Sequence, residues 1–122
     1  MRAIFASSLL AAGLGLAALP AQAQSVHCDG RLQVDPVTMT EIAASREFNE
    51  ARRQFSVGLR NLTPQPMLVF IRVGQLPGAP VNASREVELD GNASRRQGVL
   101  NVAAGSTLTP GQVQAVLQYI CR

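Results

Sequence analysis

Two cysteines, Cys28 and Cys121, constrain this sequence more than any other feature, because they lie near the two ends of its 122 residues. An exported protein with only two cysteines most simply pairs them in one disulfide bond. Such a bridge closes nearly the whole chain into a loop, which the chain-entropy treatment values at roughly 4–5 kcal/mol of stability. The alternative is a redox or metal-binding cysteine with His27 beside it. The sequence has no second histidine, and adjacent residues of an extended chain point to opposite sides, so we favour a structural Cys28–Cys121 disulfide.

The first 23 residues have the pattern of a secretory leader. A single charge at Arg2 is followed by an uncharged stretch rich in Ala, Leu and Gly, and then by a small-x-small sequence at residues 21–23. This pattern predicts a signal peptide over residues 1–23, cleaved before Gln24. A membrane anchor is the alternative, but the stretch is short and weakly apolar beside the about 20 apolar residues that a span requires.

Residues 24–122 are then predicted to form a single disulfide-closed domain that is exported to the periplasm or beyond. All eleven basic residues are arginine, which together with the Ala-rich leader is typical of a high-GC bacterium. The longest later apolar run, Met67–Ile71, is far too short for a membrane span, so none is expected in the mature chain.

Short segments of alternating polar and apolar residues, separated by turn residues, predict several β-strands. The clearest are residues 54–61 and 67–73, which are joined by a Pro-containing segment and are expected to form a hairpin. Further strands are predicted at residues 31–34, 86–89 and 97–103, with a tight turn at residues 90–92.

Two segments fit more than one structure. Ala44, Phe48, Ala51 and Phe55 follow helical spacing, which predicts a short helix or helical turn near residues 40–53. The last segment, residues 110–121, alternates as a strand that places Cys121 on its core face.

The same residues also read as a helix, in which Thr109 is the cap, Pro110 comes first and Gln112 completes a capping box. We favour the strand, and an α+β fold with a C-terminal helix over residues 110–121 is the alternative.

These segments predict a mainly β protein, a small antiparallel β-sandwich that is immunoglobulin-like in broad architecture. Residues 119–121, with the sequence Tyr-Ile-Cys, resemble the Tyr-x-Cys corner of that fold. The resemblance extends to the architecture alone and implies no functional residues.

Groups suited to acid–base or covalent chemistry are few. His27 is the only histidine, and no nucleophile motif, phosphate-binding loop or metal-ligand cluster occurs. Glu86 and Glu88 share one face of a predicted strand. Val87 and Leu89 share the opposite face, which is expected to be buried, so the two glutamates are expected to face solvent. The sequence therefore predicts a protein that is not an enzyme and has no cofactor or metal. A small secreted hydrolase or redox factor would rest on His27 and Cys28 alone.

Charge and aromatic content narrow the class of partner. The net charge is only +3 and there is no Trp, which speaks against a nucleic-acid binder or a carbohydrate platform. The doublets Arg52-Arg53 and Arg95-Arg96 are interpreted as solvated charges at strand edges. The favoured hypothesis is an exported, non-catalytic interaction protein, an accessory or chaperone-like factor for a secreted or surface assembly, whose partner protein pairs with a sheet edge. The alternative is a structural subunit of a surface fibre or envelope layer.

Overall fold

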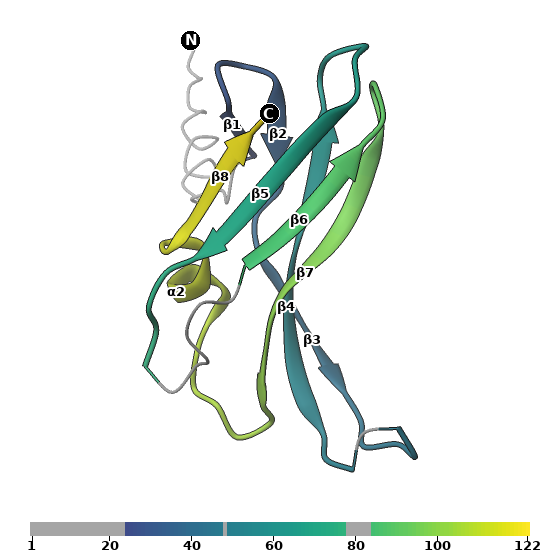
Figure 1. Ribbon diagram of the computed structural model, residues 1–122. Helices are drawn as coiled ribbons and strands as arrows, with labels where there is room; N and C mark the ends of the chain where they lie inside the picture. The colour runs from purple at the N-terminus through teal and green to yellow at the C-terminus, as the bar shows by residue number, and fades with distance from the viewer. Residues whose placement is uncertain (1–23, 48, 78–83) are drawn as a thin grey trace, which may run out of the picture.

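Two antiparallel sheets make up most of the computed structural model, which describes residues 24–47, 49–77 and 84–122 (Figure 1). The predicted signal peptide, residues 1–23, lies outside the described residues. Sheet A contains β1 (Ser25–His27), β2 (Leu32–Val34), β3 (Thr38–Ile42), β4 (Arg52–Asn61) and β7 (Ser94–Ala103). Sheet B contains β5 (Met67–Val73), β6 (Ser84–Leu89) and β8 (Leu117–Cys121), and the short helix α2 (Pro110–Gln114) precedes β8.

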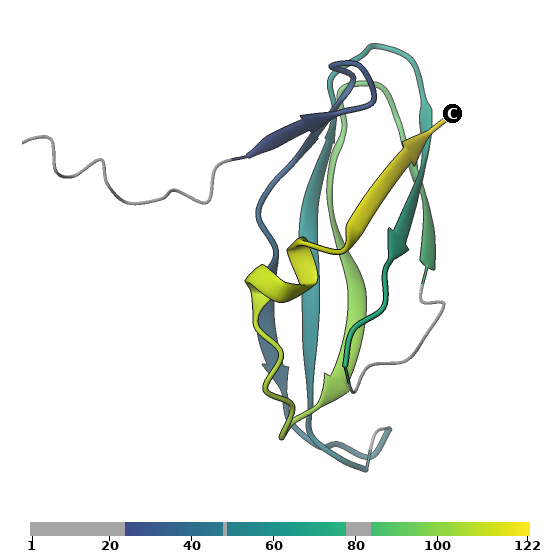
Figure 2. The same cartoon turned by 90° about the vertical axis from the view of Figure 1, so that its left-hand side faces the viewer.

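Strand β4 is the centre of sheet A. It pairs with β2 along its second half and with β3 along its first half, while β7 runs along its other side. In sheet B, β5 is central and lies between β6 and β8. Figure 2 shows the two sheets as two layers of strands.

The core lies between these layers, because each central strand alternates buried and less buried residues. Phe55, Val57 and Leu59 of β4 are almost completely buried, as are Val69 and Ile71 of β5. They belong to one hydrophobic cluster that also includes residues of β2, β6, β7 and α2. The prediction of a mainly β protein with two antiparallel sheets is therefore confirmed, and its likeness to the immunoglobulin architecture stays a prediction.

A bulge in β7 adds to this core. The register pairs Phe55 with Leu100 but Ser56 with Gly98, which leaves Val99 as the extra residue. Both Val99 and Leu100 are buried. The extra residue changes the alternation so that two successive apolar side chains reach the core.

The predicted hairpin of residues 54–61 and 67–73 is wrong, although both segments are strands. β4 lies in sheet A and β5 in sheet B, so residues 62–66 carry the chain from one sheet to the other. The turn between β6 and β7 makes the second crossing. The two crossings are joined by backbone hydrogen bonds, from Asn92 N to Thr63 O at 2.8 Å and from Asn61 N to Ala93 O at 2.9 Å.

The predicted helix near residues 40–53 is also wrong. Residues 38–42 form β3, which pairs with β4 from Thr38 opposite Ser56 to Ile42 opposite Arg52. β-Branched residues favour this extended pairing, and Phe55 follows the two-residue period of β4 rather than a helical one. Phe48, the second residue of the helical pattern, lies outside the described residues.

Both interpretations of the C-terminal segment hold, each over a different part. Thr109 caps α2 with the predicted capping box, since its hydroxyl accepts a hydrogen bond from Gln112 N at 3.2 Å. The helix ends after one turn, and residues 117–121 pair with β5 as the favoured strand. A strand over residues 110–114 is wrong, because the capping box and the complete burial of Val113 favour a helical turn there.

Candidate functional site

The predicted disulfide is present, and it joins the two sheets. Cys28 lies in the turn between β1 and β2, and Cys121 is the last residue of β8. Their Cα atoms are 6.0 Å apart across a sequence separation of 93 residues. Both cysteines are used in this bridge.

His27 lies beside the disulfide in a local cluster. Its Nε2 atom is 2.9 Å from the hydroxyl of Ser25, and its ring centroid is 4.6 Å from that of Tyr119. Burial raises the pKa of the Tyr119 phenol to about 12. Among the described residues no carboxylate is hydrogen-bonded to the His27 ring, so the serine–histidine pair has no third group to orient it.

The remaining carboxylates named by the sequence are where the alternation predicted them. Glu86 and Glu88 are exposed on β6, while Val87 and Leu89, which alternate with them, are buried. Within residues 24–47, 49–77 and 84–122, no group of three or more His, Cys, Asp or Glu side chains is arranged to hold a metal ion.

The arginine doublets occupy different environments. Arg95 and Arg96 lie on β7, an edge strand of sheet A, as predicted. Arg52 and Arg53 lie on the central strand β4 and are only partly exposed, so their interpretation as edge charges is wrong. Arg53 Nη2 lies 3.7 Å from Glu41 Oε2, and Arg53 Nη1 donates a hydrogen bond to the backbone carbonyl of Ser106 at 2.9 Å.

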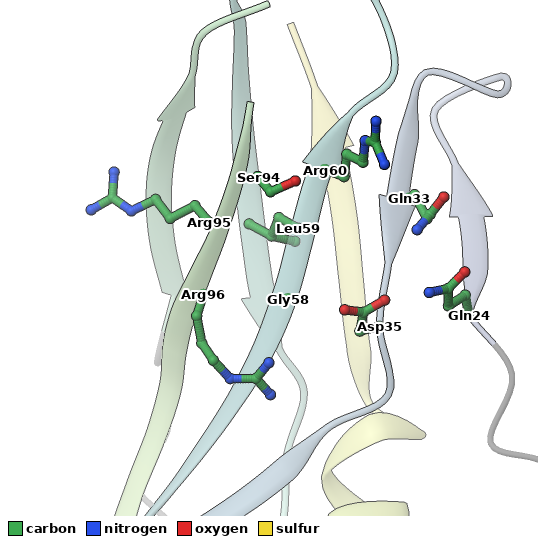
Figure 3. Close-up of a pocket in the computed structure, with 9 residues that line it drawn as sticks. All are labelled: Gln24, Gln33, Asp35, Gly58, Leu59, Arg60, Ser94, Arg95 and Arg96. Carbon is green, nitrogen blue, oxygen red and sulfur yellow. The ribbon is translucent and has the colours of Figure 1, made fainter. Parts of the chain in front are cut away.

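A hollow crosses the outer face of sheet A, and we call it the sheet A groove (Figure 3). Its volume is about 430 Å³. Its lining comes from β2, β4, β7 and the residues just before β1 and just after β2: Gln24, Gln33, Asp35, Gly58, Leu59, Arg60, Ser94, Arg95 and Arg96. The lining is therefore almost entirely polar.

Gly58 creates the hollow, because it is the one position on this part of β4 without a side chain. The carboxylate of Asp35 fills part of the space above it, and a Cβ atom on Gly58 would come within 2.6 Å of Asp35 Oδ2. The backbone explains this approach, since Asp35 N donates a hydrogen bond to Gly58 O at 2.8 Å. A glycine inside a strand often marks such a close contact.

Arg96 lies opposite Gly58 on β7 and is held across the sheet. Its Nη2 atom donates a hydrogen bond to Thr38 Oγ1 of β3 at 2.6 Å, which fixes the guanidinium beside the groove. Figure 3 shows Arg95 pointing away from the groove and Arg60 pointing toward Gln33.

Asp35 and Arg96 flank Gly58 without forming an ion pair. The ion pair of Arg53 with Glu41 lies elsewhere on sheet A. A carboxylate and an anchored guanidinium thus remain available to a bound group, which suits recognition of a polar ligand or peptide.

The groove could not be predicted from the sequence, because it is assembled from four separated segments. Asp35 reads as a turn residue before Pro36, and the arginines read as edge charges. The signal that could have found it is Gly58, a glycine in the middle of a strongly alternating strand.

The edge of β7 adjoins the groove. Among the described strands, this ten-residue strand pairs with β4 alone. By contrast, the backbone between β2 and β3 is covered by α2, because the amide of Val37 donates a hydrogen bond to Gln114 Oε1 at 3.0 Å.

No protein family, curated protein or solved structure matches the chain. No helix of the described residues is long and apolar enough to cross a membrane.

Proposed function

We propose that this protein is an exported, non-catalytic interaction module that binds an extended segment of another protein along the free edge of β7. In this proposal the chain is secreted by its 1–23 leader and acts as an accessory or chaperone-like factor for a secreted or surface assembly. The observation that carries it is the ten-residue edge strand β7 beside a groove that holds the anchored guanidinium of Arg96.

The direction of the backbone groups supports strand addition. Asn61 N donates to Ala93 O, so Ala93 faces β4. Backbone groups alternate in direction along an antiparallel strand, which turns those of Ser94 and Arg96 toward the free edge. A partner strand could therefore form main-chain hydrogen bonds there, as in other cases of strand addition.

The groove supplies side-chain recognition at the same place. Ser94 and Arg96 form its wall on β7, so a partner strand added to this edge would carry side chains next to them. Because the Arg96 guanidinium is already anchored on Thr38, less of its freedom is lost when it binds a partner. The bulge at Val99 limits regular pairing to the segment before it.

The alternative function is a structural subunit of a surface fibre or envelope layer, in which the edge of β7 would pair with another copy. The two functions differ in solution behaviour. A subunit should polymerise or fractionate with the cell surface, whereas an accessory factor should stay soluble and bind a different protein.

Two variants at one position test the proposed binding edge. Arg96→Ala removes the guanidinium but retains the backbone N–H, and Arg96→Pro removes both. Proline is tolerated where an edge-strand N–H faces solvent, so both variants should fold, which circular dichroism would check. A photocrosslinking residue at Ser94, introduced into each exported variant in the producing cell, would report the partner.

We expect one specific protein adduct from Ser94, weakened by Arg96→Ala and abolished by Arg96→Pro. The matched control is the same crosslinker at Gln118, an exposed residue of β8. Equal adducts from both positions, or an adduct that survives Arg96→Pro, would show that β7 is not the binding edge. An adduct with a second copy of this chain would instead support the structural-subunit function.

A further inference from the structure

Gln24 has a position in the groove that the proposed binding edge does not use. It is the first described residue, it precedes β1, and it lines the sheet A groove. Figure 3 shows its side chain beside that of Asp35. Asp35 is the only acidic residue of the groove lining, and its carboxylate has no ion-pair partner among the described residues.

The strand register explains why these two residues meet. β1 and β2 pair with Ser25 opposite Val34, so the next pair outward is Gln24 opposite Asp35. The backbone N–H of Asp35 donates to Gly58 of β4 and therefore points away from β1. This makes Gln24 and Asp35 a non-hydrogen-bonded pair, for which the Cα atoms are about 4.5 Å apart. The backbone nitrogen of Gln24 is only about 1.5 Å from its own Cα. In such a pair the backbone N–H groups point away from the partner strand, so an α-ammonium group at this nitrogen reaches the Asp35 carboxylate when that side chain turns from Gly58 toward β1.

We propose that leader removal creates the cationic partner of Asp35. Hydrolysis of the Ala23–Gln24 peptide bond adds water across it and leaves a carboxylate on Ala23 and an α-ammonium group on Gln24. That ammonium pairs with Asp35 and fixes the start of β1 in the groove. The inference rests on the proposed export of the chain and on cleavage before Gln24.

Other charged groups around the pair act in the opposite direction. Arg60 of β4 and Arg96 of β7 line the same groove, and both cations disfavour a further positive charge. Arg95 of β7 also lines it but points away (Figure 3). Asp35 lies opposite Gln24 itself, so its attraction is expected to exceed the repulsion from the two more distant strands.

The sequence makes this pairing unusually easy to measure. The sequence contains no lysine, so the Gln24 α-amine would be the only primary amine within residues 24–122. Reductive methylation with ¹³C-formaldehyde would then give a single amine signal by NMR, and its pH titration would report the pKa of that amine. Intact mass of the exported, disulfide-bonded protein would establish the cleavage site first.

We expect the amine pKa to be roughly half a pKa unit higher in the folded protein than in urea, a shift suited to a solvent-exposed ion pair. Asp35→Asn should abolish the difference. Asp29→Asn is the matched control, because it removes the same charge from the turn of the same hairpin, and it should leave the elevated pKa unchanged.

Three results would overturn the pairing. One is an amine pKa that Asp35→Asn does not lower. Another is complete cyclisation of Gln24, in which the amine attacks the side-chain amide and releases ammonia, since no ammonium would then exist. Cleavage at a different bond is the third, and it would also contradict the predicted leader, whereas the first two leave the proposed export and the β7 binding edge standing.

Discussion

At the scale of single residues, Asn61 connects two of the crossings between the sheets, residues 62–66 and the turn between β6 and β7. Its side chain is completely buried, and its Nδ2 atom donates hydrogen bonds to the carbonyls of Gln65, Leu89 and Asp90 at 2.7, 3.3 and 3.1 Å. Its Oδ1 atom accepts hydrogen bonds from the backbone N–H and hydroxyl of Thr63 at 2.9 and 2.8 Å. One amide therefore satisfies polar groups of both connections.

We expect Asn61→Ala to lower the free energy of unfolding by about 2–3 kcal/mol, because it leaves buried backbone groups without partners. Urea denaturation followed by far-UV circular dichroism would measure it. Asn101→Ala is the matched control, since Asn101 is exposed on β7 and should change stability by less than about 0.5 kcal/mol. A similar loss in both variants would contradict the role of Asn61.

Tyr119 gives the protein a predicted response to alkaline pH. Burial raises the pKa of its phenol from 10.0 to about 12, so the unfolded chain loses this proton before the folded one does. The stability that the protonated phenol contributes to the folded state is fully present below pH 10 and is lost as the pH rises toward 12. Tyr119 is the only tyrosine, and there is no Trp, so ultraviolet absorbance would follow its ionisation directly. Tyr119→Phe should flatten the fall in stability over this range; an unchanged fall would assign it to another group.

At the scale of elements, α2 depends on its cap more than on its length. A helix of five residues has little intrinsic stability, and the Thr109–Gln112 capping box satisfies its first amides. The helix also positions Gln114 to cover the amide of Val37. Thr109→Ala should cost about 1 kcal/mol of stability and speed hydrogen exchange at the Val37 amide. Thr107→Ala, on an exposed neighbour outside the cap, should change neither quantity.

The elements also show where sequence patterns mislead. Alternation located β4 and β5 correctly, because each buries one face whatever strand lies beside it. The same alternation holds in a hairpin and in a crossing between facing sheets, so it could not predict which strands pair. The helical spacing that ends at Phe55 was a coincidence that long-range pairing of β3 with β4 overrides.

At the scale of the whole molecule, the disulfide is expected to set the stability. It closes a loop of 93 residues between the two sheets, and such a loop contributes roughly 4–5 kcal/mol in the chain-entropy treatment, a large share of the 5–15 kcal/mol typical of a domain. The double variant Cys28→Ser and Cys121→Ser should therefore unfold at much lower urea concentration. If its unfolding midpoint matches that of the bridged protein, the entropic contribution has been overestimated.

The sequence by itself determined most strands, though not β1 or β3, and also the capping box and the disulfide pairing. Each of these depends on local periodicity, on neighbouring residues or on having only two cysteines. The tertiary structure decided which strands share a sheet, and with that it placed Asp35, Gly58 and Arg96 in one groove. Asp35 follows β2, Gly58 lies in β4 and Arg96 lies in β7, and only non-local hydrogen bonding across sheet A brings these three residues together. For the same reason Gln24 reads in the sequence as the residue after a cleavage site, and the fold alone sets it opposite Asp35.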